Sequence, residues 1–166
     1  TTGLPVELVQ LDAAGNPTTV RQTTGYDTWA RVVSYSPAAG ETTTTGYDPA
    51  GRVGTVTDPQ GTTSWGYDGT DANGQAEHRG LLTRLTVSNP GGPAVVFSAG
   101  YDPGGALTTQ RLPGGITQTT GYDTAGEPEG LSYTGQVSTV QPDGTVSGDP
   151  DGAWLSWSTE NDVTGR

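Results

Sequence analysis

Residues 41–68 of the chain read ETTTTGYDPAGRVGTVTDPQGTTSWGYD, and this stretch decides the fold. It contains three short runs rich in threonine, valine and aromatic residues, separated by two polar breaks. β-Branched and aromatic residues are enriched in strands, whereas breaks that contain proline and glycine mark turns. The pattern therefore predicts an antiparallel meander of three strands, over residues 42–47, 52–57 and 62–67.

The two breaks carry the residues that a type I turn prefers. Asp48-Pro49-Ala50-Gly51 and Asp58-Pro59-Gln60-Gly61 both have aspartate first, proline second and glycine fourth. The aspartate carboxylate can accept a hydrogen bond from the backbone amide two residues on, and proline fixes its own φ. Each unit is thus predicted to run strand, turn, strand, turn.

The same motif returns along the chain. Gly-Tyr-Asp occurs five times, and its tyrosines are 20 or 21 residues apart except for one step of 34. A regular period of this length is typical of a repeat architecture. Equivalent tyrosines two strands apart would lie roughly 10 Å from each other on one face, so we expect packing and turn roles for them. The predicted structural repeat residues are Tyr26, Asp27, Tyr47, Asp48, Gly51, Arg52, Asp58, Gly61, Tyr67, Asp68, Tyr101, Asp102, Tyr122 and Asp123.

Weaker copies extend the repeat over the whole chain. Residues 11–16, 135–145 and 161–166 each echo part of the best unit. We therefore expect an all-β fold of stacked antiparallel β-hairpins in a curved or spiralling sheet. Residues 1–166 would be a single segment of about eight hairpin units, with a longer insertion at 69–98. A cross-strand aromatic could cover the glycine that precedes each tyrosine. Two open sheet edges would favour aggregation, so we expect the chain to belong to something larger.

The composition excludes several classes of function. The net charge is −11, with seven arginines and no lysine, which argues against binding to nucleic acid through its phosphates. The absence of lysine also excludes a P-loop. Without cysteine there are no disulfides, thiolate zinc sites or thiol nucleophiles. No apolar run approaches the length that spans a membrane.

Histidine and paired acids are the residues that could support catalysis. His78 is the only imidazole, and because no nucleophile motif accompanies it we expect an exposed loop residue. Two acid pairs, Asp149 with Asp151 and Glu127 with Glu129, have the residue types that glycoside hydrolysis requires. The first pair has the sequence of another turn, so we expect no enzyme activity and no cofactor.

The insertion contains a fragment of a calcium-loop pattern. Asp71, Asn73 and Glu77 would supply oxygen ligands around a bend at Gly74. In a complete loop the first ligand and the final bidentate acid would fall on positions that are glycine here. A surface hairpin is therefore the expected structure, and no metal is expected.

Four tryptophans complete the set of candidate residues. Trp154 and Trp157 could form a stacking platform for a sugar on an exposed face, or the apolar side of an irregular hairpin. Trp29 and Trp65 lie close to Tyr-Asp positions, and we expect them to pack within the sheet. The first pair leaves open a second function, in which the sheet face recognises a glycan or a surface protein.

The Tyr-Asp pairs, together with Asp-Pro-Ala-Gly-Arg at 48–52 and Thr-Asp-Pro-Gln-Gly-Thr-Thr at 57–63, resemble the YD-repeat, or Rhs-repeat, family. The resemblance implies a hairpin sheet that spirals into a hollow shell. In bacterial toxins this shell encloses a C-terminal toxic polypeptide, and in animal teneurins a related shell supports adhesion. The resemblance thus implies a non-catalytic wall segment of a secreted or cell-surface bacterial protein. Its partners would be the flanking repeats and the enclosed polypeptide.

The chain departs from the family pattern in three places. The unit after Tyr67 carries extra residues, and Glu127 stands where the better copy has Arg52. The segment that closes the shell and cleaves itself is not recognisable in this sequence. Neither self-cleavage nor toxin activity is therefore assigned to any residue here.

Overall fold

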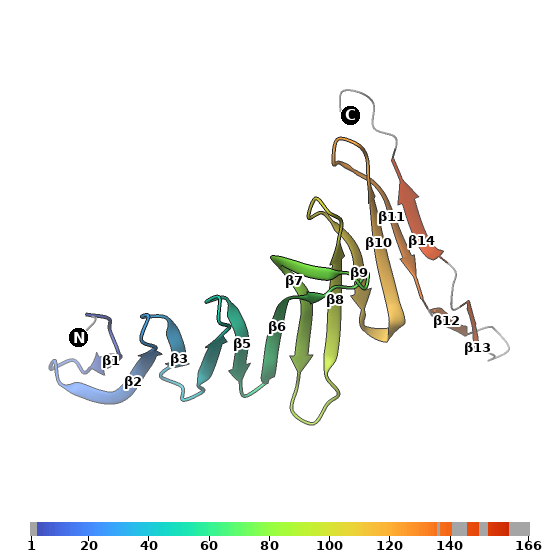
Figure 1. Ribbon diagram of the computed structural model, residues 1–166. Coiled ribbons are helices and arrows are strands. Elements are labelled where there is room, and N and C mark those ends of the chain that lie inside the picture. The colour runs from blue at the N-terminus through green and yellow to red at the C-terminus, as the bar shows by residue number, and fades with distance from the viewer. Residues whose placement is uncertain (1–2, 136, 141–145, 150–152, 160–166) are drawn as a thin grey trace. The chain divides into compact units, whose positions relative to one another are not determined.

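The computed structural model describes residues 3–135, 137–140, 146–149 and 153–159. In these ranges the chain forms antiparallel β-strands and one short 3-10 turn, η1 (Pro113–Gly115) (Figure 1). The expected all-β class and stacked hairpins are confirmed. The contacts divide the chain into two compact units, one of Thr1–Trp65 with Thr86–Ala94 and one of Gly66–Leu85 with Val95–Arg166.

The first unit is a series of hairpins in chain order. Its strands pair antiparallel in the order β1-β2-β3-β4-β5-β6 (Figure 1). The three strands predicted between residues 42 and 67 correspond to β4, β5 and β6, so the predicted meander is confirmed. The bounds are β1 (Glu7–Leu11), β2 (Pro17–Tyr26), β3 (Val32–Ser36), β4 (Thr43–Tyr47), β5 (Val53–Asp58) and β6 (Gly61–Thr70), which continues into the second unit.

The second unit repeats this arrangement. Its strands pair in the order β6-β7-β8-β9-β10-β11, and β14 lies on the other side of β11. β12 and β13 pair only with each other. The weak copy of the repeat at residues 135–145 lies partly outside the described residues. The weak copy at residues 161–166 lies wholly outside them. The bounds are β7 (Ala76–Ser88), β8 (Val95–Tyr101), β9 (Leu107–Leu112), β10 (Ile116–Tyr122), β11 (Pro128–Thr134), β12 (Val137–Val140), β13 (Val146–Asp149) and β14 (Ala153–Ser158).

Burial is sparse, because single-layer hairpins leave both sheet faces partly open to solvent. Among the described side chains, Ala72 is the only buried apolar one. The buried polar side chains are Asp71, Glu77 and Thr83, all from the β6–β7 hairpin. The hydrophobic contribution must therefore come from half-buried side chains, and hydrogen bonds between hairpins add to it.

One face of the first unit consists of hydroxyl groups. The strand register places Ser34, Thr44, Thr57 and Thr62 in one row across β3 to β6. Side-chain oxygens in neighbouring strands contact each other, as between Thr57 Oγ1 and Thr62 Oγ1 at 2.9 Å. Val56 and Thr45 pair on the opposite face. Strand alternation thus separates a hydroxyl face from a more apolar one.

The third Gly-Tyr-Asp copy differs from the prediction. β6 continues through Tyr67 and Asp68 to Thr70, so no hairpin turn begins at Asp68. Residues 68–71 read Asp-Gly-Thr-Asp and have no glycine in fourth place, whereas the four residues that begin at Asp71 end in Gly74. The turn forms there instead: Gly74 N donates to Asp71 O over 3.1 Å. Asp68 adopts a left-handed φ of 64° within the strand.

Candidate functional site at the hairpin junctions

A single turn geometry recurs throughout the chain. In the turn that begins at Asp48, Gly51 N donates to Asp48 O, and Asp48 N donates to Arg52 O, both over 2.9 Å. The Asp48 carboxylate also accepts the amide of Arg52 at 2.9 Å. Gly51 has a φ of 84°, which is open to glycine at little cost and unfavourable for other residues. The predicted roles of Asp48 and Gly51 in this turn agree with these contacts.

Six turns share this backbone pattern. The fourth residue of each turn donates to the aspartate carbonyl, and the aspartate amide donates to the carbonyl of the fifth. Among these six described turns, four follow a Gly-Tyr pair and five have glycine in fourth place, so the Asp-x-x-Gly spacing is the slightly better signal of the turn. The turns begin at Asp12, Asp27, Asp48, Asp71, Asp102 and Asp123.

Arginine reinforces two of these turns. Arg52 Nε donates to the Asp48 carboxylate at 2.7 Å, and Arg31 Nε donates to Asp27 at the same distance. Desolvation raises the pKa of both aspartates, but hydrogen bonds from the side chain and backbone of the arginine outweigh it. The pKa of Asp27 and that of Asp48 are therefore lowered. Each carboxylate stays ionised and bound within its own turn.

The tyrosine that precedes a turn connects its hairpin to the one before. Tyr47 Oη donates to Val32 O at 2.9 Å, and Tyr122 Oη donates to Leu107 O at 2.9 Å. Val32 and Leu107 are the first residues of β3 and β9. Tyr26 and Tyr101 make the corresponding bonds to Pro5 O at 3.2 Å and Leu82 O at 2.7 Å.

These tyrosines lie where the backbone ladder between hairpins has ended. β9 and β10 pair from Leu112 and Ile116 only as far as Thr109 and Thr119, three residues short of Tyr122. The phenol therefore replaces ladder hydrogen bonds at the turn end of the sheet. We call the combination of one Asp-x-x-Gly turn and the next tyrosine a hairpin junction.

The junction between β3 and β4 is also closed by a cation. The Arg31 guanidinium lies 4.1 Å from the centre of the Tyr47 ring while it remains paired with Asp27. Such cation–π contacts favour a fixed arrangement of ring and cation. Asp27, Arg31 and Tyr47 thus join two consecutive hairpins through side chains alone.

The glycines before Tyr26 and Tyr47 make room for a hydroxyl group and not for an aromatic ring. A Cβ at Gly46 would overlap Thr55 Oγ1, and a Cβ at Gly25 would overlap Ser34 Oγ. The aromatic cover expected from the sequence is therefore wrong at these two positions. The small cross-strand partner follows from the hydroxyl face of the first unit.

Asp58 and Gly61 form a tighter turn at the other end of the hairpins. They pair with each other in the ladder, which leaves Pro59 and Gln60 as a two-residue loop. Asp58 Oδ1 accepts the amides of Gln60 at 2.9 Å and Gly61 at 3.0 Å. These contacts agree with the turn predicted at residues 58–61.

The insertion is a hairpin that is attached to the following junction. Asp71 Oδ2 accepts the amide of Tyr101 at 3.1 Å. Arg79 Nη1 donates to the carbonyls of Asp102 at 3.0 Å and Pro103 at 2.9 Å, and Arg79 also pairs with buried Glu77. The sequence analysis missed this pair, although an acid two residues before an arginine on one strand places both on the same face.

The contacts around Arg79 and Asp71 shift the pKa values of two neighbouring groups, Glu77 and Tyr101. Hydrogen bonds from the Arg79 side chain, with a smaller opposing effect of desolvation, lower the pKa of Glu77 from 4.5 to about 2. Desolvation and the nearby negative charges of Glu77 and Asp71 raise the pKa of Tyr101. Glu77 is therefore a fixed anion that holds Arg79 against the next turn.

The catalytic and metal candidates from the sequence do not come together. His78 is exposed, as are Glu127 and Glu129. Asp149 lies in β13, and Asp151 is outside the described residues. Among the residues that the structure describes, no three His, Asp or Glu side chains form a group that could hold a metal ion.

In the calcium-like segment, the side chains that would be ligands have protein partners. Asp71 Oδ1 accepts the amides of Asn73 at 2.9 Å and Gln75 at 2.8 Å, while Glu77 is bound by Arg79. The segment is the turn and second strand of the β6–β7 hairpin.

The tryptophans have three different environments. Trp65 is half-buried in β6, but the side chain of Trp29 is 76% exposed, so the expectation that it packs within the sheet is wrong. Trp29 occupies the third position of a turn, outside the strand ladder. Trp157 on β14 is exposed, whereas Trp154 is in the same strand with its side chain outside the described part of the structure.

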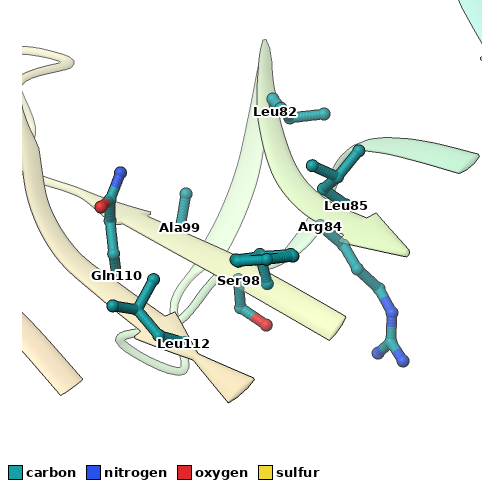
Figure 2. Close-up of a pocket in the computed structure, with 8 residues that line it drawn as sticks. Leu82, Arg84, Leu85, Ser98, Ala99, Gln110 and Leu112 are labelled. Atoms are coloured by element: carbon teal, nitrogen blue, oxygen red, sulfur yellow. The ribbon is translucent and has the colours of Figure 1, made fainter. Parts of the chain in front are cut away.

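The second unit has an apolar hollow on its sheet face. Its volume is about 200 Å³, and side chains from β7, β8 and β9 line it (Figure 2). Figure 2 shows Leu82 and Leu85 on one side and Leu112 on the other, with Ala99 between them. Arg84, Ser98 and Gln110 also line it, and the leucines offer contact to an apolar side chain.

Comparison with known families identifies the repeat. Residues 26–63, which include the turns at Asp27, Asp48 and Asp58 and the Tyr47 junction, match the family model described as RHS Repeat. This segment has the sequence of an RHS repeat. The resemblance found in the sequence is therefore confirmed for this segment. No curated protein matches the chain by sequence.

Solved structures of Tc toxins are similar to most of the chain. The crystal structure of TcdB2-TccC3-Cdc42 is 18% identical with a TM-score of 0.42, over 98% of this chain and 10% of that one. A Photorhabdus luminescens Tc holotoxin pore is 19% identical with a TM-score of 0.37. The match covers 86% of this chain and 10% of that one. The crystal structure of TcdB2-TccC3 is 16% identical with a TM-score of 0.37. The match covers 97% of this chain and 12% of that one. This chain thus spans about a tenth of their length.

The junction hydrogen bond of the RHS repeat can be tested by removing one hydroxyl group. Tyr47→Phe keeps the ring but deletes the bond to Val32 O, so we expect the free energy of unfolding to fall by about 1 kcal/mol. Urea unfolding of the chain measures the change. Tyr35→Phe, an exposed position within β3 that makes no junction contact, is the control. Equal losses in the two variants would contradict the junction assignment.

The Glu77–Arg79 pair predicts how the stability of the second unit depends on pH. Because the fold lowers the pKa of Glu77, the unfolded chain binds a proton first as the pH falls. The stabilisation that the ionised Glu77 adds to the free energy of unfolding is complete above about pH 4.5. It should be lost progressively toward pH 2, so that the free energy of unfolding falls with pH in this range. Glu77→Gln should remove that slope in unfolding curves, and Glu41→Gln, at an exposed position, should keep it. A Glu77→Gln curve that is parallel to the wild type would contradict the role of the pair.

Proposed function

We propose that this chain is a wall segment of a larger, hollow RHS-repeat shell that encloses a C-terminal polypeptide. The hairpin junction is the observation that carries the proposal. Each junction uses only one turn and the next tyrosine, so the same contact can join any number of hairpins edge to edge. Because stability then depends on neighbouring repeats, such a wall can be extended without a central core.

The chemistry of the described residues supports a mechanical role and not a catalytic one. The turn aspartates bind their own backbone amides, and Asp71 and Glu77 bind other parts of the second unit. The wall would act by keeping proteases and solvent components away from the enclosed chain.

The partners follow from the same features. Flanking repeats of the parent protein would pair with the outer strands, and the enclosed polypeptide would contact a sheet face. The apolar hollow between Leu82 and Leu112 is suited to an apolar side chain of that polypeptide. We place the parent protein among exported bacterial proteins, secreted or at the cell surface, and the enclosed polypeptide would be a toxin. No described residues form a helix able to cross a membrane.

Limited proteolysis of the parent protein tests the proposal. The wild-type particle should retain a passenger that resists protease until the repeats unfold. Gly51→Val should make the passenger digestible, because valine at a φ of 84° costs at least about 1–2 kcal/mol and opens one turn. Ala50→Val, at the exposed neighbour in the same turn, should leave the passenger protected. Repeats that elute as an extended particle with no retained passenger would overturn the shell.

A recognition module is the second candidate function. Leu155 and Trp157 are both exposed on β14, which gives one sheet face a surface for a glycan or a protein. Changing Trp154 and Trp157 together to alanine should then abolish binding of the parent protein to cells while its circular dichroism spectrum is kept. Unchanged cell binding would exclude this face.

A further inference from the structure

The turn at Asp27 is the exception among the six described turns with this backbone pattern, because the other five have the sequence Asp-x-x-Gly. In third position it has Trp29, which is 76% exposed, and in fourth position it has Ala30 in place of glycine. Ala30 nevertheless adopts a φ of 64°, which is unfavourable for a residue with a Cβ. The third residues of the other five turns are Ala14, Ala50, Asn73, Gly104 and Ala125.

The turn itself does not require a tryptophan. Trp29 N donates to Asp27 Oδ1 at 2.9 Å, just as Ala14 N donates to Asp12 Oδ1 at 2.9 Å. The indole adds no hydrogen bond to this pattern and remains exposed. Positions that break a local rule without serving the fold are candidates for function.

The indole is held in a defined orientation. The Arg31 guanidinium lies 4.8 Å from the centre of the Trp29 ring and is itself fixed by Asp27 and by the Tyr47 ring. An exposed ring held in this way loses little freedom when a ligand stacks on it. Trp29 is therefore preorganised as a flat apolar platform.

Polar groups surround this platform. Trp29, Arg31 and Tyr47 line an open recess of about 580 Å³ together with the next turn, residues 48–51. The recess thus combines an aromatic face with a guanidinium, a carboxylate and backbone groups of a turn. A sugar ring has the matching chemistry, because it presents an apolar C–H face and a rim of hydroxyl groups.

Other ligand classes fit the recess less well. The net charge of −11 opposes polyanions, including nucleic acids and sulfated glycans. Grooves for proline-rich peptides use a row of aromatic side chains, whereas Trp29 and Tyr47 are the two aromatic residues among those that line this recess. We propose that Trp29 and the recess beside Arg31 and Asp48 form a subsite for one ring of a neutral carbohydrate. This site is separate from the Trp157 face and does not depend on the shell proposal.

Nuclear magnetic resonance titration of the chain with neutral oligosaccharides tests the subsite. The probes are oligomers of glucose in α- and β-linkage, of mannose and of N-acetylglucosamine, with heparin fragments as the polyanion comparison. At least one neutral oligosaccharide should shift the Trp29 indole N–H signal in a saturable way. Trp29→Ala should weaken that binding by about tenfold or more.

Matched variants separate the subsite from other effects. Alanine occupies the third position of three other turns, so Trp29→Ala should keep the unfolding midpoint of the chain. Trp157→Ala removes a different exposed tryptophan and should bind as the wild type. The proposal is overturned if no neutral oligosaccharide shifts the Trp29 signal at millimolar concentration. It is also overturned if Trp29→Ala binds normally, or if only heparin fragments bind.

Discussion

The hydrogen bond from a junction tyrosine to the preceding hairpin is the contact on which the rest of the sheet depends. Within a hairpin, the ladder and the aspartate turn are local and form from adjacent residues. Between hairpins the ladder stops before the turn end, as β9 and β10 do at Thr109 and Thr119. There the phenol of Tyr122 carries the connection to Leu107 O. Without it, adjacent turns would separate and their polar backbone would have only water as a partner.

This dependence follows from how little apolar surface the chain buries. A protein with a large core can lose a surface hydrogen bond and remain folded, because burial of apolar area supplies most of its stability. Here Ala72 is the only buried apolar side chain in the described ranges. Stability must therefore come from many small contacts between neighbours, each worth on the order of 1 kcal/mol. That distribution is typical of repeat proteins, in which every unit is stabilised by the next.

The turns and strands could be predicted because their signals are local. Aspartate, proline and glycine at fixed offsets specify the turn that begins at Asp48, whatever the chain does elsewhere. No turn begins at Asp68, although a Gly-Tyr pair precedes it, because its fourth residue is Asp71 and not the glycine that favours a left-handed φ. The exposure of Trp29 could not be predicted from its distance to a Tyr-Asp pair, since its position within the turn decides it. The attachment of Arg79 to residues 102 and 103 depends on tertiary contacts that no spacing encodes.

The rows of serine and threonine in the first unit give one sheet face an unusual chemical uniformity. From Ser34 through Thr44 to Thr57 and Thr62, a molecule that moves across the strands meets the same uncharged group at every step. Hydroxyl groups exchange hydrogen bonds with water at little cost, and they provide neither an ion-pair partner nor a deep apolar contact. No position along this row therefore binds a passing molecule more strongly than the next. A polypeptide that lies against this face could therefore slide along it and leave it readily.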